Sequence, residues 1–370
     1  RPRFREMMAG GKKLALANPN KKVSDHFVGH VHRSYGCTYD HPRNTFYATS
    51  PGERGRNNGQ VVAVSGSIST GEQPILVASG LAEPAAIAVY EPGLSVCVVT
   101  NRGILILTEQ KDNTGTLTGA YLSRQISFKT NHRGICVTAG GGIISCANGR
   151  IRMFDGNVAH GEERILAEAN YDATINHALF TTNPARQNER SSCCFMDVVE
   201  NRLVMSDLQK HVISLWEVVD AGPDRAADIK FVRAIDVGVC KEARGKVNLR
   251  AAQIPMGKCA YASGIRLDAN GWVMCADADG RTLQVFDENL QFVTRVETTP
   301  NQLPYVSGLY VEAGGHIMVC DRKSEMGGLR VYTLESVDDD DKKPSTTSSA
   351  TAAGFAAAAR LQPQQAGRRF

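Results

Sequence analysis

Closely spaced histidines are the residues whose spacing most directly suggests chemistry. His26, His30 and His32 lie in the segment HFVGHVH. On a β-strand, the side chains of His30 and His32 would point to the same face, as pairs of zinc ligands do. No third ligand accompanies them in the sequence, which favours packed or solvated histidines over a zinc site. The segment precedes the strand-rich part of the chain, where it would serve as a linker or as an added closing strand.

Cysteines are the next residues that could take part in chemistry. The chain has ten, at positions 37, 97, 136, 146, 193, 194, 240, 259, 275 and 320. No pair has the C-x-x-C spacing of a zinc ribbon or a thioredoxin-type site. Several lie in strand-like apolar runs and are predicted to be small buried side chains. Cys193 and Cys194 open one such run, where alternation would turn one thiol inward and the other outward. The pattern favours reduced structural thiols in an interior compartment.

Sequence motifs of enzymes are not found. The triple glycine at 140–142 is not followed by Gly-Lys-Ser/Thr, so we interpret it as a hairpin turn rather than a phosphate loop. Nothing resembles a nucleophile elbow or a dinucleotide fingerprint. The remaining histidines form no triad pattern with a serine or cysteine: His41, His132, His160, His177, His211 and His316.

A repeated pattern of short strands organises the chain. The clearest copy runs from Ser263 to Asp277 and continues from Thr282 to Asp287, with an Ala-Asn-Gly turn between two runs of β-forming residues. These are hairpin signals in series. Copies start near six residues spaced by 44 to 70 positions, namely Cys37, Ile87, Ile135, Phe195, Ile265 and Leu309. Repeats of this length predict a six-bladed β-propeller, with loop insertions in the longer intervals.

Composition agrees with one large all-β domain. Of 370 residues, 42% are hydrophobic and 35 are glycine, which fits short strands joined by many turns. No run approaches the 18 apolar residues of a membrane span. The net charge of +4 is too small to indicate nucleic-acid binding by itself.

The segment GIRLDANGWVMCADADGRTLQVFDENLQFV, from Gly264 to Val293, resembles the NHL repeat. The shared features are a Gly-Ile start, a Gly turn, an apolar run ending in Ala-Asp and a closing aromatic-Asp pair. The resemblance weakens toward the N-terminus and covers residues 34 to 334. It implies a six-bladed propeller that acts as a binding platform and is not an enzyme. WD-repeat and seven-bladed propellers are the alternatives.

Propellers of this appearance include metal-dependent lactonases of the gluconolactonase kind, which bind a divalent ion in the central channel through oxygen ligands. The resemblance makes Asp207, Asp277 and Asp321 the metal candidates, since each ends the second strand of its repeat. The same aspartates occupy a turn position, where a carboxylate caps backbone N–H groups. We favour the capping interpretation and predict no cofactor.

RNA binding is a third possibility, because some NHL propellers use a basic face. Arginines near predicted turns would supply it: Arg54, Arg56, Arg102, Arg124, Arg133, Arg150 and Arg152. Phosphate contacts would make the affinity fall steeply with salt.

We expect three parts: a basic N-terminal extension (1–33), the propeller (34–335) and a low-complexity tail (336–370). The first 22 residues hold seven basic residues and one acid, which is typical of a cleaved targeting peptide or a basic arm, so we predict a mitochondrial or otherwise cytoplasmic location. The function predicted is a scaffold, an accessory subunit of a large assembly. Five basic residues would contact its partners: Arg1, Arg3, Arg5, Lys12 and Lys13.

Overall fold

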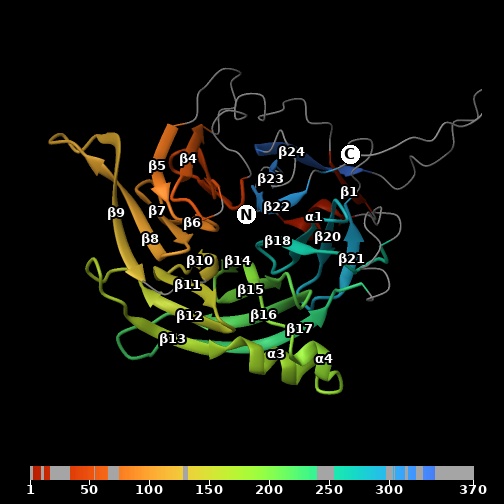
Figure 1. Cartoon of the computed structure of the whole chain (residues 1–370). Coiled ribbons are helices and arrows are strands. Elements are labelled where there is room, and N and C mark those ends of the chain that lie inside the picture. Colours follow the sequence, from red (N-terminus) through yellow and green to blue (C-terminus); the bar gives the residue numbers. More distant parts are fainter. Residues whose placement is uncertain are drawn as a thin grey trace, which may run out of the picture.

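The chain folds as a ring of six four-stranded antiparallel sheets (Figure 1). The computed structural model describes residues 3–9, 12–16, 34–53, 55–65, 75–127, 132–239, 254–296, 303, 305–312, 316–321 and 328–337. In five of these sheets, or blades, successive strands pair with their sequence neighbours from the axis outward. The predicted all-β, six-bladed propeller is therefore confirmed.

The strands follow the repeat predicted from the sequence. The first three blades are β2 (Cys37–Asp40), β3 (Thr45–Ser50), β4 (Gly59–Ser65) and β5 (Ile75–Leu81); β6 (Ile87–Glu91), β7 (Ser95–Thr100), β8 (Gly103–Lys111) and β9 (Leu117–Ser127); and β10 (His132–Val137), β11 (Gly142–Ala147), β12 (Arg150–Asp155) and β13 (Ile165–Asn170). The fourth and fifth blades are β14 (Cys193–Val199), β15 (Arg202–Asp207), β16 (Val212–Val219) and β17 (Asp228–Asp236); and β18 (Ala262–Leu267), β19 (Val273–Asp277), β20 (Thr282–Phe286) and β21 (Phe292–Arg295).

The sixth blade is assembled from both ends of the described chain. It contains β22 (Val306–Val311), β23 (His316–Asp321) and β24 (Gly328–Val337), and its outer strand is β1 (Lys13–Leu16). Leu16 pairs with Leu334 in this ladder. Part of the segment expected to be an N-terminal extension therefore closes the ring, and β24 extends past residue 335. The histidine segment 26–32 lies outside the described residues.

A short helix connects the start of the described chain to the fifth and sixth blades. Phe4, at the beginning of α1 (Phe4–Met7), is fully buried in the cluster between the fifth and sixth blades. Its backbone N–H donates to the carboxylate of Asp268 at 2.9 Å, in the β18–β19 turn. Both contacts bind the N-terminal segment to the propeller body.

Each interface between neighbouring blades holds one hydrophobic cluster, so the core is a ring of six clusters. Phe286 is buried between the fourth and fifth blades, as its place in the repeat predicts. Trp272 is only partly buried and packs against the cluster between the fifth and sixth blades. The largest fully buried side chain is Trp216, in the fourth blade.

Glycines let the innermost strands of neighbouring blades come close. A Cβ atom on Gly264 would lie 2.6 Å from Cβ of Leu309, and one on Gly308 would lie 2.6 Å from the carbonyl oxygen of Tyr35. The close approach of the backbones, rather than a sharp turn, excludes a larger side chain here.

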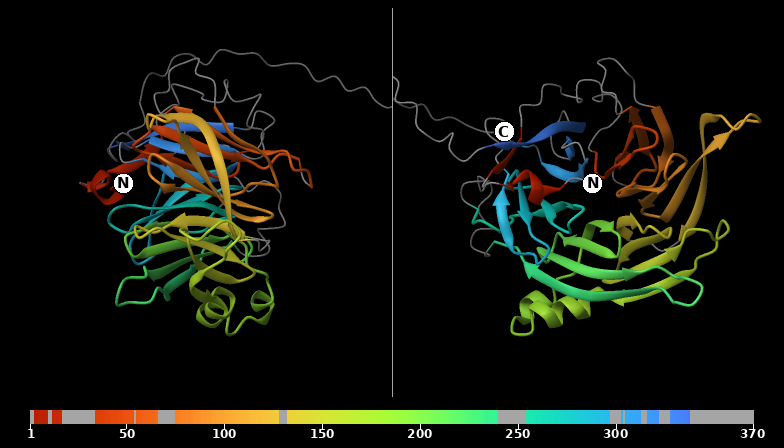
Figure 2. Two further views of the ribbon diagram at one scale, coloured as in Figure 1. Left: turned by 90° about the vertical axis from the view of Figure 1, so that its left-hand side faces the viewer. Right: turned by 180° about the vertical axis from the view of Figure 1, so that it is seen from behind.

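The long interval before the fourth blade contains two helices, α3 (Tyr171–Leu179) and α4 (Pro184–Gln187). Asn170 and Asn183 cap them by accepting from Ala173 and Arg186 N–H groups. The helices lie at the rim of the ring, on the third and fourth blades (Figure 2). Within the described ranges, no helix has the length and apolar character needed to cross a bilayer.

Candidate functional site

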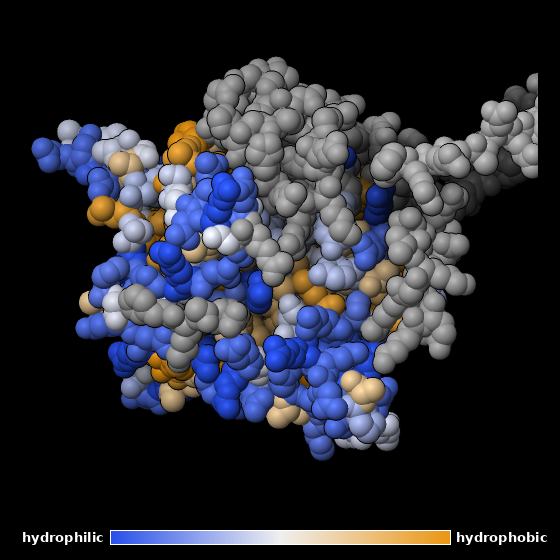
Figure 3. All heavy atoms as spheres, viewed as in Figure 1, coloured by the Kyte–Doolittle hydropathy of each residue, from blue (hydrophilic) through white to orange (hydrophobic). Residues whose placement is uncertain are grey.

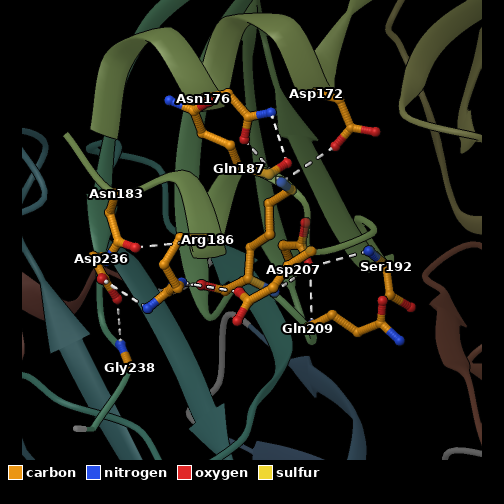
Figure 4. A network of polar contacts seen from close by, with 12 residues as sticks. Asp172, Asn176, Asn183, Arg186, Gln187, Ser192, Asp207, Gln209, Asp236 and Gly238 are labelled. Atoms are coloured by element: carbon orange, nitrogen blue, oxygen red, sulfur yellow. Dashed lines mark hydrogen bonds and ion pairs between the residues drawn. The ribbon is translucent and has the colours of Figure 1, made fainter. Parts of the chain in front are cut away.

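The aspartates that end the second strands face the backbone of their own turns. Asp207 is fully buried and accepts N–H groups of Ser192, Gln209 and Lys210 at 2.9–3.0 Å (Figure 4). Burial raises the pKa of Asp207, and the three backbone donors partly offset that rise. Oδ1 of Asp207 therefore connects the residue before β14 with the loop between β15 and β16.

Asp277 has the same arrangement in the next blade. It is fully buried and accepts N–H groups of Ala260, Tyr261 and Gly280 at 2.9–3.0 Å. Burial raises its pKa, again against the effect of the backbone donors. Asp321 ends β23 in the corresponding place, but its side chain lies outside the described part.

Asp207 and Asp277 do not fit a shared metal site. They lie in different blades, and each carboxylate already accepts three backbone N–H groups of its own blade. In the portion of the chain that the structure describes, no group of three or more His, Cys, Asp or Glu side chains is placed to hold a metal ion. What these residues do locally is cap strand-to-turn junctions.

The central channel is the place where all six blades meet. A small cavity of about 30 Å³ lies on the axis and is lined from every blade, mostly by apolar residues and backbone, including Cys37, Ile87, Ile135, Phe195, Ile265 and Leu309. A cavity of this order has room for roughly two water molecules. Substrate pockets are typically about ten times larger or more.

Two aromatic rings fill the channel between opposite blades. Tyr35 precedes β2 in the first blade, and Phe195 lies in β14 of the fourth; their rings stack with centroids 5.6 Å apart and planes at 18°. Phe195 pairs with Ser206 in the position where Gly308 pairs with Cys320 in the sixth blade. The fourth blade thus has the phenyl ring of Phe195 at the position where the sixth blade has a glycine without a side chain.

A ladder irregularity between Cys193 and Phe195 precedes this position, as it does in the first ladders of the third, fifth and sixth blades. The sequence repeat aligned Phe195 with Ile265, whereas the pairing makes Met196 the equivalent of Ile265. The same irregularity explains why Cys193 and Cys194 are both buried, contrary to the predicted alternation. Burial raises the pKa of both thiols, so neither is activated as a nucleophile.

Arg266 of β18 crosses the channel at the next level. Its guanidinium lies 3.3 Å from the carboxylate of Asp197 in the fourth blade. It also donates to the carbonyl oxygens of Leu309 in the sixth blade, at 2.7 Å, and Cys37 in the first, at 3.1 Å. The ring of Tyr310 lies under it, 5.0 Å from the guanidinium carbon. One side chain therefore links four blades across the axis.

A buried cation in the fourth blade was not predicted from the sequence. The side chain of Lys210 is fully buried and its ammonium group lies 2.9 Å from Oδ1 of Asn176, on α3. Arg186, on α4, donates to the carbonyl oxygen of Lys210 and lies 3.3 Å from Asp236 (Figure 4). A buried lysine is rare unless it is paired. This network fixes the α3–α4 connection to the blade, and only long-range contacts reveal it.

The predicted partner-binding residues lie at the start of the described chain. Arg3 pairs with Glu6 at 2.9 Å, and Arg5 and Lys12 are exposed. Lys13 opens β1. Arg1 lies outside the described residues.

Most of the arginines considered for RNA binding have partners within the chain. Arg56 pairs with Glu53, and Arg150 and Arg152 share Glu168. The side chain of Arg124 donates to backbone carbonyl groups of the third blade. Arg102 and Arg133 are exposed, and Arg54 lies outside the described part.

Comparison with known proteins finds likeness in structure only. No protein-family profile matches the sequence, and no curated protein matches it. Solved structures do match. A structural-genomics protein of unknown function from Bacteroides thetaiotaomicron has a TM-score of 0.53 at 14% identity, covering 82% of this chain and 70% of its own.

Two enzymes are also among the matches. A luciferin-regenerating enzyme has a TM-score of 0.51 at 11% identity, with 88% of this chain and 95% of its own covered. A gluconolactonase from Xanthomonas campestris has a TM-score of 0.50 at 12% identity, with 88% and 98% covered. At these identities the likeness shows the fold alone: the chain is a six-bladed β-propeller whose structural neighbours include a gluconolactonase.

Proposed function

We propose that this chain is a non-catalytic protein-interaction propeller, an accessory subunit of a larger assembly. The observation that carries the proposal is the filled channel. Tyr35 and Phe195 stack across it, Arg266 links four blades at it, and the cavity that all six blades line measures about 30 Å³. Because a substrate needs a far larger pocket, binding on the outer surfaces is favoured over chemistry on the axis.

The NHL-like pattern of the fifth blade supports the same proposal, and membership of that family stays a prediction. The mitochondrial location also stays a prediction, made from the basic N-terminal segment. Partner contacts through Arg5 and Lys12 follow from their exposure beside the ring-closing strand.

A two-part experiment tests the proposal. In the first part, purified protein is incubated with sugar lactones and aryl esters in the presence of calcium, manganese or zinc. We expect no metal-dependent hydrolysis. Turnover that disappears in Asp277→Asn, while the variant keeps its fold, would instead establish the lactonase alternative.

In the second part, the tagged chain is purified from its native source with chemical cross-linking. We expect a constant set of protein partners, and a reduced yield of them when Arg5 and Lys12 are both replaced by Glu. Replacing the exposed Lys111 and Arg225 by Glu is the matched control. Recovery of RNA alone, with an affinity that falls steeply with salt, would favour the RNA-binding alternative.

A further inference from the structure

The two ends of the described chain meet in the sixth blade. β1 pairs antiparallel with the end of β24, and Lys13 lies opposite Val337. Continued by one residue, the same register would bring Asp338 opposite Lys12. The four residues that follow β24, at 338–341, are all aspartates. An acidic run therefore begins where the chain leaves a strand that is paired with the basic N-terminal segment.

An open groove lies beside this end of β24. It is formed by the N-terminal segment and the β18–β19 turn, and its lining residues are Arg5, Glu6, Met8, Ala9, Asn270 and Trp272. Its volume of about 600 Å³ is within the range of ligand-binding clefts. The hydroxyl group of Ser336 donates to the carbonyl oxygen of Met7, so the chain leaves β24 in contact with α1. Figure 2 shows α1 on the face of the ring that is seen from behind.

The segment that forms this groove carries net positive charge. Residues 3–13 include four basic residues and one acid, Glu6, which pairs with Arg3. Arg5 is exposed and forms no ion pair with a described residue. Hydrophobic surface gathers in other blades, over β5 and β9 at the upper left of Figure 3. The charge beside β24 therefore favours an acidic occupant.

We propose that the segment beginning with the acidic run 338–341 of this same chain occupies the groove and covers Arg5 and Lys12. Other acidic segments would match the charge, but this one is joined directly to β24. A tethered segment is present at an effective concentration of about millimolar, which favours it over a free partner of equal intrinsic affinity. Exposed ion pairs contribute little individually and are screened by salt, so the contact depends on the tether. The run would compete with partners for Arg5 and Lys12, a consequence that rests on the proposed function.

Trp272 reports whether the groove is covered. The chain has two tryptophans, and the other, Trp216, is buried. Acrylamide quenching of tryptophan fluorescence in the full chain therefore measures access to Trp272. The neutral variant combines four changes: Asp338→Asn, Asp339→Asn, Asp340→Asn and Asp341→Asn. We expect its quenching constant to be about twofold higher than that of the wild type, because the ion pairs that hold the segment are lost. The wild type in about 1 M salt should show the same rise, because the Debye length falls to about 3 Å.

Charge reversal distinguishes a direct contact from an indirect effect. Arg5→Glu combined with Lys12→Glu should make Trp272 as accessible as it is in the neutral variant. Adding Asp338→Lys and Asp339→Lys to these two changes should restore the protection, because opposite charges then meet again.

The matched control removes two acids at exposed positions in other loops, Asp224→Asn and Glu162→Gln, and should be quenched as the wild type is. Equal quenching of the wild type and the neutral variant would overturn the inference. So would a charge reversal that restores no protection. Protection that disappears on dilution would also overturn it, because a second copy would then supply the segment.

The competition with partners is measured separately, by the cross-linked purification that tests the proposed function. The neutral variant should give a higher yield of partners than the wild type. If its groove is open and the yield is unchanged, Arg5 and Lys12 do not contact the partners. That result would contradict their role in the proposed function, while the quenching data would still establish that the acidic run covers the groove.

Discussion

The rings of Tyr35 and Phe195 stack across the axis of the propeller, with centroids 5.6 Å apart, although they belong to opposite blades. Phe195→Ala should lower the free energy of unfolding by about 2–3 kcal/mol, slightly less than for a fully buried phenylalanine. A double-mutant cycle with Tyr35→Ala should give a coupling of about 0.5–1.5 kcal/mol. Urea denaturation measures both values, and strictly additive effects would contradict a direct stack.

The ion pair between Arg266 and Asp197 links the neighbouring fifth and fourth blades at the channel. Removing one member of a buried pair leaves an uncompensated charge, so Asp197→Ala should destabilise the protein by about 3–5 kcal/mol. The double variant Asp197→Leu/Arg266→Met should lose much less than the sum of the two single changes. Chemical denaturation of all four proteins checks this. If Asp197→Ala unfolds at the wild-type urea concentration, the pair does not hold the ring together.

The N-terminal segment should contribute to the stability of the propeller, although the sequence predicts that it is a basic extension outside the propeller. Phe4→Ala removes a fully buried ring from the cluster between the fifth and sixth blades and should destabilise by about 3–5 kcal/mol. Arg5→Ala, at the neighbouring exposed position of α1, should have little effect. Deletion of residues 1–16 should lower the melting temperature strongly, because β24 would lose its partner. A deletion that melts with the full chain would mean that β1 is dispensable.

Gly264→Ala tests the close packing of the innermost strands. The added Cβ would lie 2.6 Å from Cβ and 2.8 Å from the backbone nitrogen of Leu309, so one blade must shift. We expect a loss of about 1–3 kcal/mol, the usual cost of overpacking. Gly222→Ala is the control, since no atom lies within 4 Å of its added Cβ. Equal melting temperatures for the two variants would show that the blades adjust freely.

The pH dependence of stability should reflect the buried aspartates. Burial raises the pKa of Asp277 above its ordinary value of 3.8. Between the pKa of Asp277 in the unfolded chain and its higher pKa in the native state, the native state binds more protons than the unfolded chain. The free energy of unfolding therefore falls as the pH rises through that interval. Asp277→Asn should flatten this slope. It should also lower stability by about 1–3 kcal/mol, because the amide nitrogen of Asn cannot accept the backbone N–H group of Ala260.

Denaturation series from about pH 4 to pH 7 measure this slope, an interval that lies above the ordinary pKa of an aspartate. Asp224→Asn, at an exposed position, is the control and should leave the profile unchanged. A steeper slope in Asp277→Asn would show that the pKa of the native carboxyl is lowered rather than raised.

The sequence by itself determined the blades. Alternating apolar residues and turn residues are local signals, so the three inner strands of the fifth blade follow from residues 262–286 alone. The capping role of Asp207 and Asp277 has the same local origin, because their backbone donors lie at most 17 residues away. Six repeats of one such pattern were enough to predict the ring.

Only the tertiary structure decided how the ring closes and what fills its axis. The four residues of β1 carry too short a pattern to identify a strand, and their partners in β24 lie more than 300 positions later. The stack of Tyr35 on Phe195 depends on the pairing of β14 with β15, which places Phe195 where the sixth blade has Gly308. This stack joins residues of opposite blades, and the two rings meet only once the ring has assembled, so no local pattern in the sequence encodes it.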